Sequence, residues 1–155
     1  MTERTETTQL YIPALGRIYE ALAPFAYPLL RLTVGLMAVP HGMQKLFQLF
    51  GGNRTGTAAL FTKYGIEPAM PLVYLVGTVE FFAGLAIAVG FLTRPAAALL
   101  FGVMFVAVFK VHINIGFFWT QLGLEYPLMW GLALIVIAIR GGGLYSVDKS
   151  LGKEI

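Results

Sequence analysis

The sequence contains no cysteine and few charged residues. Without cysteine the chain cannot form a disulfide, exchange thiols, hold an iron–sulfur cluster through thiolates or build a cysteine-based zinc site. Only 12% of its 155 residues are charged while 57% are hydrophobic, whereas a soluble globular domain is about one quarter charged. This composition excludes an ordinary soluble domain and predicts a protein whose solvent is largely the lipid bilayer.

Two further signals are missing from the chain. Met1 to Gln9 is rich in Thr and Glu and lacks the basic start and apolar core of a secretory signal, so we expect no cleavable signal. The formal net charge is +3, and the basic residues are scattered and fall partly within apolar stretches. We therefore expect no nucleic-acid partner.

Four apolar stretches predict an all-α integral membrane protein, a bundle of four spanning helices. The stretches are Tyr27 to Phe47, Pro71 to Phe91, Pro95 to Phe117 and Glu125 to Arg140. A bilayer core of about 30 Å needs about 20 helical residues, so the first three are long enough to span it and the fourth is short. Before them, the apolar residues between Pro13 and Ala23 fall at helical spacing, which predicts a short amphipathic helix on the membrane surface.

The chain accordingly divides into an N-terminal interfacial segment (1–24), a four-helix domain (25–140) and a C-terminal tail (141–155). One side of the predicted bundle carries six basic residues: Arg4, Arg17, Arg94, Arg140, Lys149 and Lys153. The other side carries Arg54 and Lys63. Because cytoplasmic loops hold the excess of Lys and Arg, both termini are expected in the cytoplasm.

Polar and ionisable residues inside or at the edges of the apolar stretches are the candidate functional residues. They are Arg31, His41, Gln44, Lys45, Glu80, Lys110, His112 and Glu125. An ionised side chain near the bilayer centre costs on the order of 3 kcal/mol, so these side chains should face the bundle interior and find partners there. The spacing i, i+3, i+4 places His41, Gln44 and Lys45 on one face of the first helix.

Counting along the helices places most of these residues in the outer half of the bilayer, Glu80 near the middle and Arg31 toward the cytoplasm. The expected pairs are Glu80 with His41 or Arg31, and Glu125 with Lys45 or Lys110. The buried set then keeps one surplus positive charge, which an anion, a quinone oxygen or a lipid phosphate would neutralise.

Structural roles are open for several of these side chains. Lys45 lies within one turn of the predicted helix end and could extend to the outer headgroups. Arg31 could extend inward, or pair with Glu80 only to hold helices in register. Two histidines at similar depth would also permit a b-type haem. We assign no metal site, because no two His or Glu residues lie at ligand spacing on one helix.

The motifs around these residues give the chain a family resemblance. The most specific is His41-Gly42-Met43-Gln44-Lys45-Leu46-Phe47, which follows Leu30-Arg31-Leu32 and Gly35. Others follow in order: Gly77-Thr78-Val79-Glu80, Leu92-Thr93-Arg94, Lys110-Val111-His112, Glu125-Tyr126-Pro127-Leu128 and Gly143-Leu144-Tyr145-Ser146-Val147-Asp148. Over about residues 28–148 the chain resembles the DoxX family of small bacterial and archaeal membrane proteins. The resemblance implies a four-helix protein of the prokaryotic cell membrane.

The resemblance also implies quinone-linked redox work, as in the large-subunit type of thiosulfate:quinone oxidoreductase. Our leading hypothesis is an oxidoreductase subunit that binds a quinone in the outer half of the bilayer. His41, Glu80 and His112 are the predicted catalytic residues, because quinone reduction needs hydrogen-bond donors and a proton route. The predicted quinone-binding residues are Arg31, Gln44, Lys45, Lys110 and Glu125. Electrons would come from a thiosulfate-like anion or from a partner redox subunit.

Two alternatives belong to other functional classes. The protein could be a membrane scaffold whose polar network fixes helix packing and which recruits soluble redox enzymes. It could also be a small transporter or a binder of anions or lipid headgroups that uses the surplus positive charge. In each case membrane lipid is an expected partner, and the sequence is compatible with a homo-oligomer.

Overall fold

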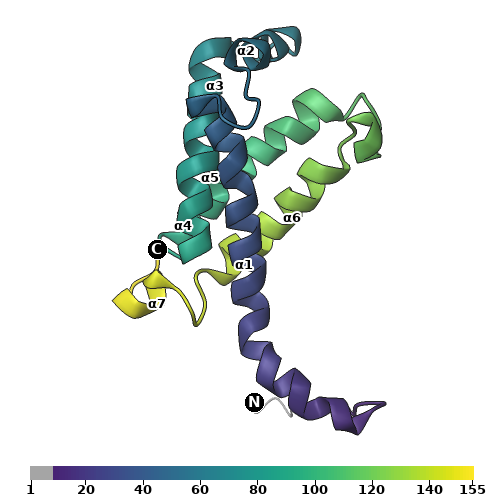
Figure 1. The fold of residues 1–155 in the computed structure, drawn as a ribbon, viewed down its shortest axis with the longest axis vertical. Coiled ribbons are helices and arrows are strands. Elements are labelled where there is room, and N and C mark those ends of the chain that lie inside the picture. Colours follow the sequence, from purple (N-terminus) through teal and green to yellow (C-terminus); the bar gives the residue numbers. More distant parts are fainter. Residues whose placement is uncertain (1–8) are drawn as a thin grey trace, which may run out of the picture.

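The computed structural model describes residues 9–155, which form helices joined by short loops and contain no strand in that range (Figure 1). The longer helices are α1 (Gly16–Phe47), α2 (Arg54–Lys63), α3 (Ala69–Thr78), α5 (Thr93–Val106) and α6 (Glu125–Arg140). The shorter ones are η1 (Pro13–Leu15), η2 (Val79–Ala83), α4 (Gly84–Val89), η3 (Ala107–His112), η4 (Trp119–Gln121) and α7 (Val147–Leu151). Of these, η2 and η3 are π-helices, and η1 and η4 are 3₁₀ helices.

The helices assemble into four rods. One rod is α1, a second joins α3, η2 and α4, a third joins α5 and η3, and the fourth is α6. Three are long and apolar enough to cross a membrane: Pro13–Phe47, Ala69–Val89 and Thr93–His112. The fourth, α6, has 16 residues and spans about 24 Å at 1.5 Å per residue. The predicted all-α bundle of four helices is confirmed, and α6 begins and ends at the predicted residues.

The N-terminal helix predicted before Pro24 is present but continuous with the first rod. α1 runs through Pro24 and Pro28 for 32 residues, or about 48 Å, which exceeds the thickness of a bilayer core. A proline removes one backbone hydrogen bond and bends a helix where neighbouring turns can hold it together. Figure 1 shows α1 turning near its N-terminal end instead of stopping. Its first turns therefore extend beyond the bundle.

The bundle has two ends, here called the tail end and the loop end. The tail end is formed by the α4–α5 turn at residues 90–92 and by residues 141–155, and the loop end by α2 and residues 113–124.

The loop end differs from the sequence-based expectation. α2 was not predicted, and the third rod ends at His112 rather than at Phe117. Arg54 of α2 donates to the carbonyls of Lys45, at 2.8 Å, and Leu46, so it closes the last turn of α1.

Glycines bring α1 against the second rod. Gly35 and Gly42 face Gly77 and Gly84, and the two glycines on each rod are seven positions apart. A Cβ at Gly42 would lie 2.5 Å from the backbone nitrogen of Phe81, and one at Gly35 would lie 2.5 Å from the carbonyl oxygen of Gly84. The two backbones therefore touch, which is how membrane helices associate through small residues.

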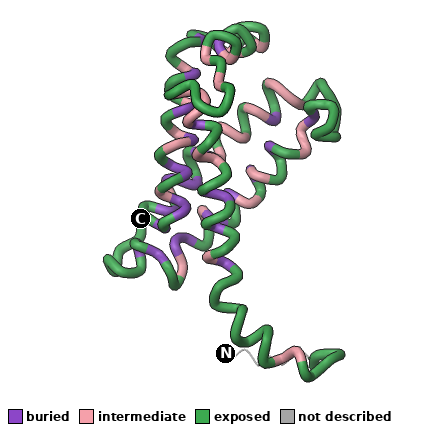
Figure 2. Tube along the Cα trace, viewed as in Figure 1, coloured by how far each residue is buried: buried purple, intermediate pink, exposed green. Residues whose placement is uncertain are grey.

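The apolar core lies toward the tail end, where all four rods meet. Its most buried members are Val34, Ile87, Ala97, Leu100, Leu134 and Ile137. Figure 2 shows that buried residues concentrate in this part of the bundle, whereas α5 and α6 lean away from α1 toward the loop end. Large apolar side chains such as Leu75, Leu99 and Leu132 are exposed on the outward faces. These faces suit contact with lipid.

Candidate functional site

A cavity of about 440 Å³ lies where α5 and α6 diverge from α1, a size within the range of about 300–1,000 Å³ usual for ligand sites. Its lining residues are Val34, Met37, Ala38 and His41 of α1, Glu80 of η2, Leu100, Met104, Ala107 and His112 of the third rod, and Tyr126, Pro127, Trp130 and Leu134 of α6. The cavity is thus mainly apolar and belongs to all four rods.

His41, Glu80 and His112 are the histidine and carboxylate residues that line this cavity. They come from three different rods, so only the folded bundle brings them together. The sequence alone had placed the two histidines in the outer half of the bilayer and Glu80 near its middle, without showing that the three share one space. Their catalytic role stays a prediction, but the structure supplies the common cavity that this role requires.

Lys45 pairs with Glu80. The Lys45 Nζ lies 2.7 Å from the Glu80 Oε2, and the Glu80 residue is only 6% exposed. The predicted pairs of Glu80 with His41 or Arg31, and of Lys45 with Glu125, are therefore wrong. The reason is the close packing of α1 on the second rod, because a Cβ at Gly77 would lie 2.8 Å from the Lys45 Cβ.

Two π-helical turns carry Glu80 and His112. η2 contains Glu80 and η3 ends at His112, and π-turns within α-helices occur frequently at functional sites because they locally redirect side chains. Sequence reasoning missed both turns. A single inserted residue hardly changes the apolar periodicity of a spanning helix, so the only available signal was the polar residue itself.

The loop at residues 113–124 holds His112 in one orientation. The Nδ1 of His112 lies 2.5 Å from the carbonyl oxygen of Leu122, and a carbonyl can only accept a hydrogen bond, so Nδ1 carries the hydrogen. The Nε2 atom is then left for another partner. Glu125 stabilises the same loop by accepting a hydrogen bond from the backbone N–H of Trp119 at 3.0 Å.

Several predicted quinone-binding residues lie outside the cavity lining. Glu125 caps the loop and pairs with neither Lys45 nor Lys110, which corrects that prediction. Lys110 is exposed on η3, and Gln44 donates to the carbonyl oxygen of Phe50 at 3.1 Å. Gln44, Lys110 and Glu125 are therefore not among the residues that line the cavity.

Arg31 lies at the tail end and fastens the C-terminal tail. Its guanidinium donates to the carbonyls of Gly142 at 2.6 Å and Tyr145 at 2.7 Å, and also to that of Ala88 at 3.4 Å. The residue is only 3% exposed. Arg31 therefore belongs neither to the cavity nor to an ion pair with Glu80, and the structure corrects both predictions.

Asp148 is a second tail contact, and sequence reasoning missed it. Its carboxylate accepts hydrogen bonds from the Leu92 N–H at 2.7 Å, the Thr93 N–H at 3.0 Å and the Thr93 hydroxyl at 2.7 Å. Burial raises the pKa of Asp148, but the hydrogen bonds from Thr93 and Leu92 outweigh it and hold that pKa below its usual range. Its place in the Ser146-Val147-Asp148 motif was the available signal.

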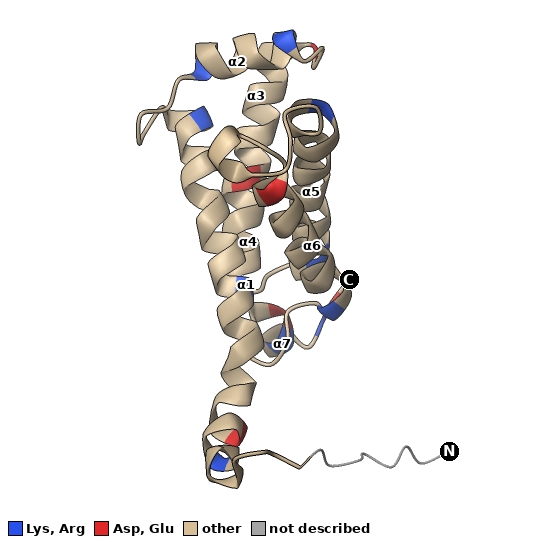
Figure 3. Cartoon of the chain, turned by 90° about the vertical axis from the view of Figure 1, so that its right-hand side faces the viewer, with Lys and Arg blue, Asp and Glu red and all other residues tan. Residues whose placement is uncertain are grey.

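Figure 3 shows charged residues near α2, near α7 and in the first turns of α1, and acidic residues midway along the bundle. Within residues 9–155 the ion pairs are Lys45–Glu80 and Arg94–Glu154, the latter at 3.3 Å. The same described residues contain no group of three or more His, Cys, Asp or Glu that could hold a metal ion. The two histidines that line the cavity can form hydrogen bonds and transfer protons, and the Glu80 carboxylate, paired with Lys45, lies beside them.

Comparison with known proteins adds a family to this geometry. The sequence model of the DoxX family matches residues 26–113, which carry His41, Glu80 and His112. The inner membrane protein YqjF of Escherichia coli K12 is 35% identical over 126 residues, 78% of this chain and 95% of YqjF. The membrane protein Rv3486 of Mycobacterium tuberculosis H37Rv is 29% identical over 155 residues, 92% of this chain and 91% of Rv3486. No solved structure matches significantly. The chain therefore belongs to the DoxX family of membrane proteins.

Proposed function

We propose that this membrane protein is the quinone-binding subunit of a membrane oxidoreductase. The observation that carries the proposal is the shared cavity of about 440 Å³, in which two histidines from different rods line a mainly apolar space beside Glu80. A quinone has an apolar ring and two carbonyl oxygens that accept hydrogen bonds. An apolar cavity with a small number of convergent polar groups matches that chemistry.

A lipid-soluble ligand would enter from the side of the bundle. Met37 of α1 and Tyr126 of α6 both line the cavity and are 52% and 47% exposed. The cavity therefore reaches the molecular surface between α1 and α6, on flanks whose large side chains are apolar. Quinones dissolve in the bilayer core, so an opening on this flank suits their arrival.

The histidines and the ion pair have separate roles in this proposal. His112 presents its Nε2 while Leu122 holds Nδ1, and His41 faces the same space from α1. Each imidazole, when protonated, donates a hydrogen bond to a quinone oxygen and can pass on a proton. Lys45 holds the Glu80 carboxylate beside the two histidines. From this position Glu80 takes part in the proposed proton route.

Reducing a quinone to a quinol adds two electrons and two protons. The protons would reach the oxygens through His41 and His112. The electrons would come from a reduced donor at the loop end, either a thiosulfate-like anion or a partner redox protein. The cavity's part is to bind the ring, orient its oxygens and exclude bulk water.

Tryptophan fluorescence offers a direct binding test. The chain has two tryptophans, and Trp130 lines the cavity while Trp119 does not. In a Trp119→Phe background, a short-chain quinone should quench Trp130 in a saturable way. His41→Ala and His112→Ala should each weaken binding about tenfold, the effect of losing a hydrogen bond of about 1.4 kcal/mol.

The matched control is Lys110→Gln on the same rod, because Lys110 is exposed and does not line the cavity. It should leave the quinone affinity unchanged. Non-saturable quenching, or equal affinity in both histidine variants and the control, would contradict the proposal.

A further inference from the structure

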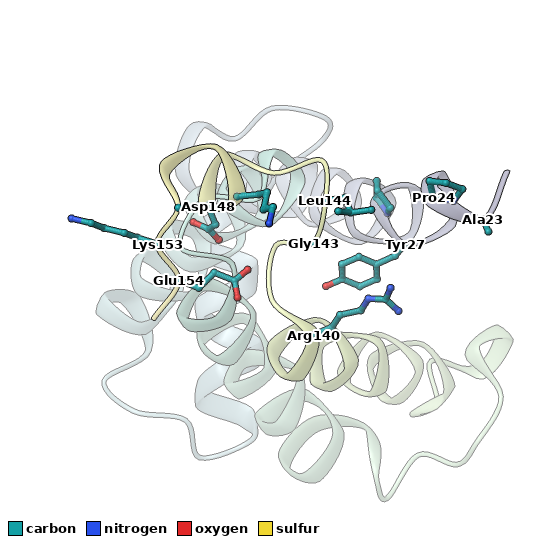
Figure 4. A pocket seen from close by; sticks show the side chains of 12 residues that line it. Ala23, Pro24, Tyr27, Arg140, Gly143, Leu144, Asp148, Lys153 and Glu154 are labelled. Atoms are coloured by element: carbon teal, nitrogen blue, oxygen red, sulfur yellow. The ribbon is translucent and has the colours of Figure 1, made fainter. Parts of the chain in front are cut away.

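A second cavity, of about 540 Å³, lies at the tail end and shares no lining residue with the first. It is formed between α1 and the C-terminal tail (Figure 4). Pro24 and Tyr27 contribute from α1, Arg140 from the end of α6, and Lys149 and Lys153 from the tail. None of these residues takes part in the proposed quinone chemistry.

The acidic groups of this cavity already have partners. The Asp148 carboxylate accepts its hydrogen bonds from Leu92 and Thr93. The Glu154 carboxylate accepts a hydrogen bond from the Gly142 N–H at 2.8 Å and lies 3.3 Å from the Arg94 guanidinium. Both carboxylates thus serve to close the tail onto the bundle.

The basic groups have no acidic partner in the part of the chain that the structure describes. Its two ion pairs involve Lys45 and Arg94, so Arg140, Lys149 and Lys153 are not paired there. The Arg140 guanidinium lies 4.4 Å from the centroid of the Tyr27 ring, which fixes it at the edge of the cavity. Three cations thus line the cavity without an ion-pair partner among the described residues, whereas the two carboxylates of the cavity are already engaged by other groups.

The cavity has an apolar side as well. Figure 4 shows Ala23, Pro24 and Leu144 on one side, with Lys153, Asp148 and Glu154 on the other. Leu144 is 67% exposed, and the cavity lies where the apolar rods end. A phospholipid has the same division between its acyl chains and its phosphate.

We infer that the tail-end cavity binds the phosphate group of an anionic phospholipid. Arg140, Lys149 and Lys153 are the cationic partners of the phosphate. The glycerol and acyl portion of the lipid contacts the side of the cavity formed by Leu144. Guanidinium groups bind phosphate through two parallel hydrogen bonds, and lysines add charge. Basic pockets at the ends of membrane helices recognise anionic headgroups in this way. A soluble phosphate ester carries the same group without the acyl chains.

Ligand-dependent thermal stability of the full chain in a nonionic detergent tests this inference. Short-chain phosphatidylglycerol should raise the Tm in a saturable way, and phosphatidylcholine of equal chain length should have at least tenfold lower affinity. Glycerol phosphate is the third ligand. If it binds as tightly as phosphatidylglycerol, the site takes a soluble phosphate ester, whereas weaker binding assigns it to lipid.

The variants separate a built site from general charge attraction. Lys149→Gln with Lys153→Gln should weaken phosphatidylglycerol binding about tenfold, and adding Arg140→Gln should abolish it. The double variant changes only exposed side chains, so it keeps the test valid if the triple variant fails to fold. The control is Lys63→Gln with Lys110→Gln, which removes the same charge from residues that do not line the tail-end cavity. Equal affinity in the tail-end and control variants, or no saturable binding of phosphatidylglycerol or glycerol phosphate, would overturn the inference.

Discussion

At the scale of single residues, the Lys45–Glu80 pair joins α1 to the second rod beside the cavity. The two side chains are 16% and 7% exposed, and their atoms lie 2.7 Å apart. Removing one partner of a buried pair leaves an uncompensated charge, which is more destabilising than removing both. The pair therefore contributes to helix packing as well as to the proposed proton route.

A double-mutant cycle measures that contribution. Lys45→Met should lower the free energy of unfolding by about 3 kcal/mol because Glu80 loses its counter-charge. The double variant Lys45→Met, Glu80→Gln should recover part of this loss. Denaturant unfolding in detergent gives the four values. If the two single effects simply add, Lys45 and Glu80 are not coupled and their proximity has no energetic role.

Asp148 makes the attachment of the tail pH-dependent. Because its pKa is held below the ordinary value of about 3.9 by hydrogen bonds from Thr93 and Leu92, its stabilising effect is present above about pH 4. The effect is lost as the pH falls through the pKa of the folded state. The Tm difference between wild type and Asp148→Asn should be constant above about pH 5 and shrink below about pH 4. A difference that does not change between pH 3 and pH 7 would contradict this assignment.

At the scale of the helices, the close contact between α1 and the second rod depends on glycine. Gly42→Ala would place a Cβ 2.5 Å from the Phe81 nitrogen and 2.8 Å from the Gly77 carbonyl oxygen. Since these backbone atoms cannot move away locally, we expect a loss of about 1–3 kcal/mol in unfolding free energy.

Gly102→Ala is the control for that substitution. Gly102 also lies within a spanning helix, but a Cβ there meets no atom within 4 Å. The variant should be neutral or more stable by up to about 1 kcal/mol, because alanine favours the helix. If the two alanine variants unfold alike, close packing at Gly42 is not a determinant of stability.

The positions of the helices could largely be predicted from the sequence, but local irregularities within the helices could not. Apolar runs of helical length predicted the four rods, and α6 starts at Glu125 and ends at Arg140 as predicted. The π-turns η2 and η3 were invisible because one extra residue hardly changes a uniformly apolar pattern. α1 passes through Pro24, because a proline removes only one backbone hydrogen bond and bends a helix without having to end it.

At the scale of the whole molecule, the predicted site residues divide between the two ends of the bundle. His41, Glu80 and His112 meet in one cavity, which depth counting had made plausible. Arg31 instead binds carbonyls of residues more than 100 positions later in the chain. Backbone acceptors have no sequence signature, so that contact could not be predicted. The partners of Lys45 depended on the rotation of α1 against the second rod, which hydropathy does not encode.

The distribution of basic residues predicts how the bundle sits in the membrane. Because the chain has no cysteine, a single introduced cysteine reports one position. Thr55→Cys at the loop end and Ser150→Cys at the tail end both alter exposed residues. An impermeant maleimide should label Thr55→Cys in intact cells and Ser150→Cys only after the membrane is permeabilised. The reverse labelling pattern would place the loop end, where the proposed electron donor acts, on the cytoplasmic side and would contradict the predicted orientation.

The most direct test of the central claim is photolabelling with an azido-quinone, followed by mass spectrometry of the peptides. A quinone seated in the cavity should modify residues 34–41 of α1 and 126–134 of α6, and excess unlabelled quinone should protect them. His41→Ala and His112→Ala should reduce the labelling about tenfold. Labelling chiefly on outward faces, such as those around Leu75 and Leu99, without protection or dependence on the histidines would contradict a quinone site and favour the scaffold hypothesis.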